Sequence, residues 1–221
     1  PSGPLQPAET AEFRMTQPWV QLAGNQERQL LEFAPDRAGF SDRYAHSQLS
    51  PEAFAWMAKL LPTQLLNKDV FLCHGTPQSD SDYFLDSVDA PQVRAATPDE
   101  VEARLGSVST SVVLCRHTHI PRVVRSRSGQ LLVNPGSVGL QAYEDDNPVY
   151  HAVENHSPNA RYAIVEKRDE AWSAQLLEVP YDHASAADMA RQRGAATWAM
   201  ALLSGHIQAA ASPLQQTING D

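Results

Sequence analysis

The pattern of apolar and polar positions differs between segments of this chain. In the first half it predicts helices that alternate with buried strands. Short apolar runs at 19–23, 69–73 and 111–115 are typical of strands buried in a sheet. Residues that start helices, Ser50 and Thr97, each precede a proline. Helical spacing is found in PLQPAETAEFRMTQ, NQERQLLEF, SPEAFAWMAKLL and TPDEVEARLG. This half therefore predicts α/β structure.

The pattern changes in the second half. RVVRSRSGQLLVN and RYAIVEKRDEAWSAQLLEV each hold two apolar-rich stretches around a polar turn, which predicts two β-hairpins. Residues 184–204 are rich in alanine at helical spacing. No repeat, low-complexity block or long linker interrupts residues 1–221, so we expect a single domain. The order of the elements predicts a layered α/β domain with a pair of mixed sheets.

The net charge of the chain limits the classes of molecule that we expect it to bind. The chain has 17 basic and 26 acidic residues, for a net charge of −9. Nucleic acids and anionic membranes need a basic surface, so we expect neither as the main partner. A small phosphorylated substrate stays possible, because bound metal ions reverse the local sign of charge. No apolar stretch approaches the roughly 18 to 20 residues of a membrane span.

The two cysteines each close an apolar run. Cys73 and Cys115 have no C-x-x-C partner, which predicts two buried free thiols in a reducing compartment. We therefore expect a cytoplasmic location.

Three of the eight histidines lie just past predicted buried strands. They are His74, His117 and His119, and Asn25 follows a strand-like run in the same way. Ligands collect at such strand ends in open α/β sheets, and neutral imidazole suits zinc, manganese, iron or nickel. In an extended segment residues i and i+2 point the same way, so His117 and His119 would reach adjacent positions of a two-metal centre. A lone H-x-H is usually coincidence, but this combination predicts a metal site.

Other hydrolase signatures are missing. Residues 136–139 lack the spacing of a G-x-S-x-G elbow, and neither HExxH nor a P-loop is present. The acidic run 144–146 is most simply a solvated loop. The remaining histidines lie in polar or loop-like contexts, and we expect them on the surface: His46, His151, His156, His183 and His206.

Four motifs in order, GNQER, HGTP, HTHIP and VNPGSVGL, resemble those of the calcineurin-like metallophosphoesterases, in particular the small bacterial phosphodiesterase-type branch. The resemblance implies a two-sheet mixed sandwich flanked by helices. It also implies a dinuclear centre, often manganese, iron, zinc or nickel, that hydrolyses a phosphoester. By resemblance, Asn25, His74 and His117 bind one ion and His119 binds the other. A glycine of NPGSVG would shape a turn nearby.

The chain departs from the family pattern at three places. The family carries an aspartate and a histidine on its first strand and a bridging aspartate in a GD motif. We expect these to precede Pro1, so that the N-terminal strands are missing and apolar strand edges are exposed. Gln26 replaces the histidine that usually protonates the leaving group, and an amide transfers no proton at neutral pH. Arg116 replaces a glycine, and either turns to solvent or contacts the phosphate bidentately.

Two functions follow from these observations. The first is a metal-dependent phosphoesterase acting on a phosphodiester or a phosphomonoester, with Gln26 and Arg116 as candidate catalytic positions. The second is a non-catalytic module of the same fold that serves as a binding or scaffold surface. The intact HGTP, HTHIP and VNPGSVGL motifs favour the enzyme, and the departures at Gln26 and Arg116 favour the module.

Overall fold

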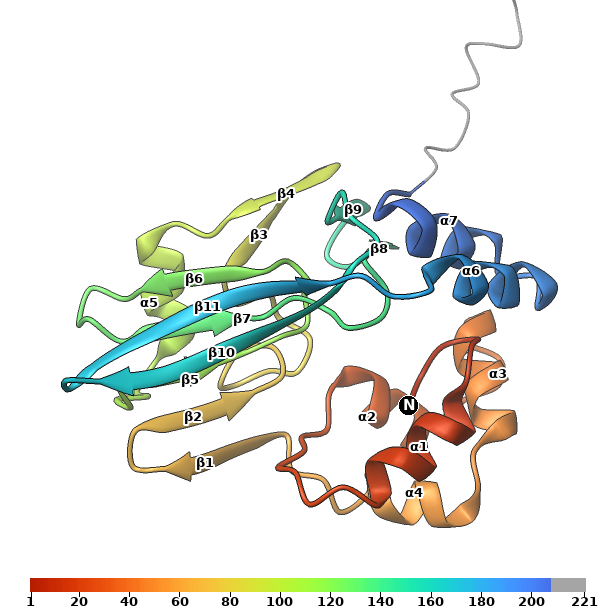
Figure 1. Ribbon diagram of the computed structural model, residues 1–221, viewed down its shortest axis with the longest axis horizontal. Helices are drawn as coiled ribbons and strands as arrows, with labels where there is room; N and C mark the ends of the chain where they lie inside the picture. The colour runs from red at the N-terminus through yellow and green to blue at the C-terminus, as the bar shows by residue number, and fades with distance from the viewer. Residues whose placement is uncertain (208–221) are drawn as a thin grey trace, which may run out of the picture.

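A five-stranded mixed sheet forms the central layer of the protein (Figure 1). The structure is a computed structural model that describes residues 1–207. The strands lie in the order β1 (Thr63–Asn67), β2 (Val70–Cys73), β5 (Val112–Leu114), β7 (Leu131–Asn134) and β6 (Arg122–Arg125). β2, β5 and β7 are parallel, and the two edge strands are antiparallel to their neighbours. Parallel order brings the carboxyl ends of the three inner strands to one edge.

Side chains of the inner strands alternate between two apolar layers, because successive strand residues point to opposite faces. Val70 and Leu72 of β2 belong to one hydrophobic cluster, and Phe71 and Cys73 belong to another. The second cluster includes the apolar side of α5 (Pro98–Leu105), which therefore covers one face of the sheet.

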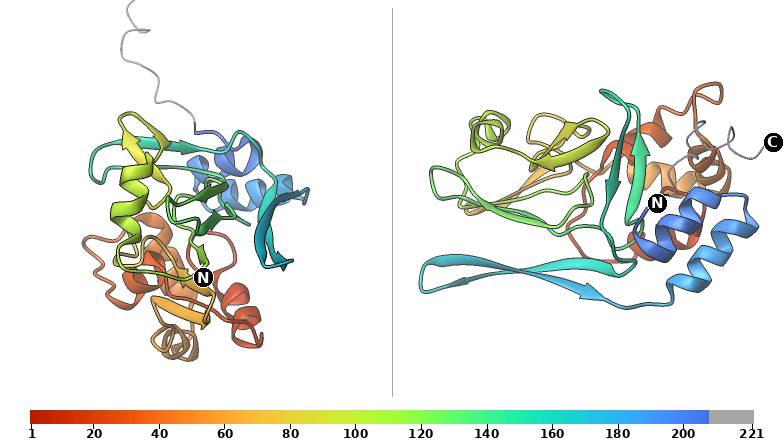
Figure 2. Two further views of the ribbon diagram at one scale, coloured as in Figure 1. Left: turned by 90° about the vertical axis from the view of Figure 1, so that its left-hand side faces the viewer. Right: turned by 90° about the horizontal axis from the view of Figure 1, so that it is seen from above.

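The opposite face is covered by a long two-stranded ribbon (Figure 2). β10 (Ala160–Arg168) and β11 (Ala171–Val179) pair antiparallel along all nine residues. Val165 and Trp172 pack against the sheet, whereas Tyr162 and Ile164 are exposed. The second layer of the expected sandwich is this ribbon, and the predicted α/β fold with a mixed sheet and flanking helices is confirmed.

Helices gather at the end of the sheet where the parallel strands stop (Figure 1). The N-terminal helices α1 (Pro7–Met15), α2 (Asn25–Leu31), α3 (Phe40–Gln48) and α4 (Pro51–Met57) share one apolar cluster. The predicted caps are confirmed, since Ser50 accepts from the Ala53 amide and Thr97 forms a capping box. α6 (His183–Gln192) and α7 (Ala196–Ser204) form a second pair, because Gly194 at φ +78° breaks the expected single helix.

Several elements differ from the sequence prediction. The run 19–23 is not a strand, because only Leu22 forms an isolated bridge, to Leu61. Helix α3 and strand β1 were not predicted. Two short hairpins were also not predicted: β3 (Asp86–Asp89) with β4 (Gln92–Ala95), and β8 (Ala142–Asp145) with β9 (His151–Glu154). These strands carry many polar residues, so their apolar pattern is weak.

The predicted free thiols are confirmed. Cys73 and Cys115 are both unpaired and buried in the sheet. Burial raises the pKa of the Cys73 thiol to about 12, and it also raises the pKa of Cys115. Both therefore act as small apolar side chains. Among residues 1–207, no helix is both long enough and apolar enough to pass through a bilayer.

Candidate metal centre

Two parallel strands deliver the candidate histidines to the same edge of the sheet. His74 follows β2 directly, and the Arg116–His119 segment follows β5, which pairs with β2 in register. The Arg116 amide donates to the His74 carbonyl at 2.8 Å, which joins the two strand ends. The imidazole rings of His74 and His117 lie 5.2 Å apart between centroids. The sheet thus brings together side chains that lie 43 positions apart in the sequence.

Asn25 reaches the same place from the first residue of α2. Its Oδ1 lies 3.0 Å from His74 Nε2, and an amide oxygen only accepts, so His74 donates from Nε2. Gly24 permits this approach, because a Cβ there would lie 2.6 Å from the His74 ring. The glycine before Asn25 is therefore a packing requirement of the site.

His117 and His119 do not lie on an extended segment, so the expected i, i+2 geometry is wrong. Both residues have left-handed backbones, with φ of +63° and +61°. The Thr118 amide donates to the Arg116 carbonyl at 2.8 Å, which turns the chain tightly between them. Such conformations cost a non-glycine residue on the order of 1–3 kcal/mol and cluster at functional sites. Arg116 itself has no positive φ, so a glycine is not needed there for backbone conformation.

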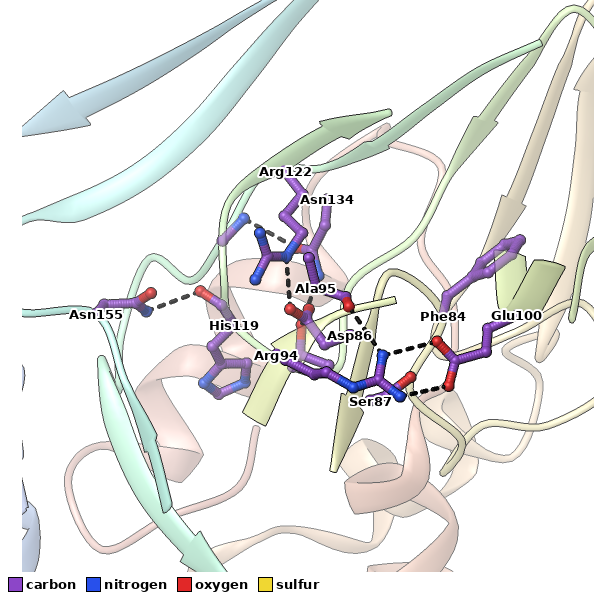
Figure 3. Close-up of polar contacts among 12 residues, drawn as sticks. Phe84, Asp86, Ser87, Arg94, Ala95, Glu100, His119, Arg122, Asn134 and Asn155 are labelled. Atoms are coloured by element: carbon purple, nitrogen blue, oxygen red, sulfur yellow. Dashed lines mark hydrogen bonds and ion pairs between the residues drawn. The ribbon is translucent and has the colours of Figure 1, made fainter. Parts of the chain in front are cut away.

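A buried polar network supports this turn (Figure 3). Thr118, which is 1% exposed, donates to Asp86 Oδ2 at 2.9 Å and accepts from Asn134 Nδ2 at 3.0 Å. Asp86 is fully buried and accepts from Arg122 Nε at 2.5 Å. Asn134 also donates to the Arg116 carbonyl at 2.7 Å. These side chains fix the positions of His117 and His119, and all of them except Arg122 are buried.

The three imidazoles are neutral because the fold buries them. Burial lowers the pKa of His74 to about 3, with nearby His117 and Arg116 acting in the same direction. Burial lowers the pKa of His119 to about 3 as well, again with Arg116 contributing. The pKa of His117 is also lowered, chiefly by burial. Neutral imidazole is the form that binds metal ions.

Backbone carbonyls fix which nitrogen is free on two of the rings. His119 Nδ1 lies 2.9 Å from the Leu140 carbonyl, so Nδ1 carries the proton and the Nε2 lone pair is free. His117 Nε2 lies 2.8 Å from the Ser81 carbonyl, which leaves its Nδ1 lone pair free. Metal-binding histidines usually donate their other ring proton to such an acceptor.

The separation of Asn25 and His74, which a hydrogen bond now spans, is also the spacing of two ligands on one divalent ion. Two ligand atoms about 2.1 Å from one ion and at right angles to each other lie about 3.0 Å apart. The separation of Asn25 Oδ1 and His74 Nε2 is 3.0 Å. Within residues 1–207, no hydrogen bond or ion pair joins a carboxylate to His74, His117 or His119. The donors present are therefore three neutral nitrogens and one amide oxygen, a set suited to zinc, iron or nickel.

Two tyrosines lie beside the strand-end histidines, and one of them is hydrogen-bonded to a fourth histidine, His151. The Tyr83 ring contacts His117, and the Tyr143 ring contacts His119. Tyr83 Oη lies 2.8 Å from both Tyr143 Oη and His151 Nε2. His151 Nδ1 donates to the Val149 carbonyl, so Nε2 accepts from Tyr83, and Tyr83 in turn accepts from Tyr143.

His151 corrects one prediction from the sequence. It is fully buried, and the expected surface position is wrong. The polar, loop-like run 144–148 that precedes it concealed the fact that both ring nitrogens are bonded inside the protein. Burial raises the pKa of Tyr83 to about 12, and it also raises the pKa of Tyr143. Both phenols are therefore neutral at physiological pH.

Gln26 and Arg116 occupy different surroundings. Gln26 Nε2 donates to Gln29 Oε1 at 3.0 Å along α2, so its amide is engaged on its own helix. The exposed Arg116 side chain lines a cavity of about 430 Å³ between the sheet and the ribbon. Among the described residues its guanidinium has no hydrogen bond or ion pair. Gly136, at φ +88°, forms the expected turn against the His119 carbonyl.

The sequence missed the residues that support the site. Asn134 is the last residue of a buried strand, and His74 directly follows one. The position of Asn134 at a strand end is therefore a signal that could have identified it from the sequence. Asp86 and Tyr83 come from a segment without strong periodicity, so no comparable signal exists for them.

Comparison with known proteins supports the fold. Neither the models of known protein families nor the curated protein sequences contain a match to this chain. The crystal structure of a metallophosphoesterase from Sphaerobacter thermophilus matches with a TM-score of 0.68 and 21% sequence identity. The match covers 92% of this chain and 84% of that one. At this identity the likeness shows the fold alone.

Proposed function

We propose that this protein is a metal-dependent phosphoesterase that cleaves a phosphodiester, with a phosphomonoester as the other possible substrate class. The observation that carries the proposal is the group of three partly buried, neutral imidazoles at adjacent strand ends in a metallophosphoesterase fold. Bound divalent ions would neutralise the phosphate and lower the pKa of a coordinated water. Manganese, iron, zinc and nickel are the candidate ions, and the cytoplasm is the proposed location.

The protein residues would divide the work as follows. Asn25 Oδ1, His74 Nε2 and His117 Nδ1 would hold one ion, and His119 Nε2 would hold the second. Binding requires His74 to give up the proton that it donates to Asn25. The carbonyls of Ser81 and Leu140 keep His117 and His119 in the tautomers that offer a free nitrogen.

Arg116 is the residue we propose to contact the substrate phosphate. Its guanidinium lacks a partner among the described residues, and its charge acts on both His74 and His119. A guanidinium can bind two phosphate oxygens at once. Replacing Arg116 with glutamine should raise KM at least fivefold, whereas Arg37→Gln, another exposed arginine, should leave KM unchanged. An unchanged KM in Arg116→Gln would remove Arg116 from the site.

Gln26 limits the leaving group in this proposal. Without a general acid at this position, catalysis loses about 10²- to 10⁴-fold on leaving groups that need protonation. We therefore expect turnover of nitrophenyl esters and very slow turnover of alkyl esters. Equal rates on the two would contradict this role for Gln26.

A second function, a non-catalytic binding module, is favoured by two observations. Gln26 bonds to Gln29, and within residues 1–207 no carboxylate forms a hydrogen bond or ion pair with the three histidines. The two functions separate in an assay of bis-nitrophenyl phosphate with added manganese. Turnover that His119→Ala abolishes supports the enzyme. Metal binding without turnover supports the module.

A further inference from the structure

We propose that Glu154, His156 and His206 form a separate zinc site, which pins the end of α7 to the end of β9. Their ligand atoms all lie within 4.8 Å of one another. In the described part of the chain, no other three His, Cys, Asp or Glu residues meet this condition. The site is distinct from the strand-end histidines, and the inference does not depend on the proposed phosphoesterase function.

The spacing of the ligand atoms matches a tetrahedral ion. With zinc–ligand distances of about 2.0–2.1 Å, neighbouring ligand atoms of a tetrahedron lie about 3.4 Å apart. The Nδ1 atoms of His156 and His206 are 3.3 Å apart. His206 Nδ1 and Glu154 Oε2 are 3.4 Å apart. Both separations are the edge length that one zinc ion requires.

The backbone holds the ligands in this arrangement from two directions. His156, with φ of +56°, donates its amide to the Gly205 carbonyl at 3.1 Å. Gly205 ends α7 in a left-handed conformation, and a Cβ there would lie 2.4 Å from the Ser157 nitrogen. Only glycine allows the two chain segments to approach so closely. The helix end and the strand end are thus in contact before any ion binds.

The carboxylate is positioned by a second contact. Glu154 Oε1 accepts from the Ile207 amide at 2.7 Å, which leaves Oε2 for the ion. His156 and His206 are exposed, so an ion can enter from solvent. Two imidazoles and one carboxylate supply three ligands and leave the fourth position for water. Imidazole nitrogen and carboxylate oxygen are both common ligands of zinc in proteins.

The chain between the ligands also touches the strand-end histidines. Asn155 lies between Glu154 and His156, and its Nδ2 donates to the His119 carbonyl at 2.8 Å (Figure 3). An ion at the proposed site would therefore steady the segment that supports His119.

Zinc titration of the chelator-stripped protein, in competition with a chromophoric chelator, tests the proposal. His206→Gln should bind one equivalent fewer than the parent protein, and Glu154→Gln should bind that equivalent at least tenfold more weakly. His183→Gln is the matched control, since His183 begins α6 outside the cluster, and it should bind as the parent does. His74→Gln should keep the equivalent that His206→Gln loses, which separates this site from the strand-end centre.

Stability provides a second readout. Zinc should raise the melting temperature of the parent by several degrees more than that of His206→Gln, because an ion that bridges two elements favours the folded state. Circular dichroism shows whether each variant is folded. If His206→Gln does not fold, Glu154→Gln replaces it in the comparison. Equal zinc equivalents and equal affinity in the parent and His206→Gln would overturn the proposal.

Discussion

The strand-end histidines and the His156–His206 pair place the same side chain in opposite surroundings. His74, His117 and His119 are largely enclosed, and burial lowers the pKa of each of them. His156 and His206 are exposed, yet their nitrogens converge to within 3.3 Å. The comparison teaches that a fold can prepare a histidine in two ways. Burial fixes its charge and tautomer, whereas close approach of two backbones fixes its position.

The buried set depends on a supporting network, and the exposed set does not. Thr118, Asp86, Asn134 and Arg122 hold the left-handed turn at His117 and His119. The exposed pair relies on the contact between His156 and Gly205. Changes to charge or to internal hydrogen bonds should therefore act mainly on the buried histidines.

Of the changes considered, acid should cause the largest loss of stability, and it should act through the strand-end histidines. A histidine whose pKa is about 3 in the folded protein and about 6.5 in the unfolded protein lowers the stability of the protein only when it binds a proton. Above pH 6.5 neither state binds the proton, so the protein keeps its full stability. Below pH 6.5 the unfolded state binds it first, so stability falls with pH until the folded pKa is reached. His74 and His119 together should cost about 3 kcal/mol between pH 6.5 and 5.

Urea denaturation of the metal-free protein at the two pH values measures this loss. His74→Gln/His119→Gln lacks both imidazoles, so its stability should fall about 3 kcal/mol less over the same interval. Parallel pH profiles for the parent and the double variant would show that the two histidines are not buried as neutral groups.

Removing the carboxylate beneath the turn should have the next largest effect. Asp86→Ala leaves Arg122 and Thr118 without their partner, and Arg122 is 27% exposed, so water compensates only in part. We expect a loss of about 2–3 kcal/mol in the free energy of unfolding, measured in urea. Asp188→Ala, whose partner is the exposed Arg191, should cost less than about 1 kcal/mol. Equal losses for the two variants would mean that the network does not support the turn.

A methyl group beside His74 should have the smallest effect. Gly24→Ala places a Cβ 2.6 Å from the His74 ring, which must move away from Asn25. We expect affinity for the strand-end ion to fall about tenfold, as when other groups that orient a ligand are changed. Gly39→Ala is the matched control, because Gly39 also precedes a helix and has no atom within 4 Å of the new Cβ. Equal metal affinity in both variants would show that the Asn25–His74 geometry is not needed.

The sequence predicted the strand-end histidines because that signal is local. A buried apolar run followed by His74 or His117 can be recognised without tertiary information, and parallel pairing then brings the strand ends together. The geometry of H-T-H was not predictable, because the left-handed turn depends on Asp86, which lies 32 positions from Thr118. The tertiary contact between Asp86 and Thr118 favours the left-handed turn over the extended backbone that the sequence predicted.

The fold shows the same division. The long ribbon was predicted from two apolar-rich stretches around a polar turn, and the inner strands were predicted from short continuous apolar runs. The hairpins β3–β4 and β8–β9 were missed because polar residues dominate them, although they supply Asp86 and His151 to the interior. Buried polar residues carry no hydrophobic period, so their positions emerge only from the structure.

Anomalous diffraction from crystals soaked in zinc tests the central claim most directly, because it locates ions without reference to activity. We predict one peak within about 2.5 Å of Asn25 Oδ1, His74 Nε2 and His117 Nδ1, and a second beside His119 Nε2. Crystals with no anomalous peak at these strand ends, while ions bind elsewhere on the protein, would contradict a metal centre there.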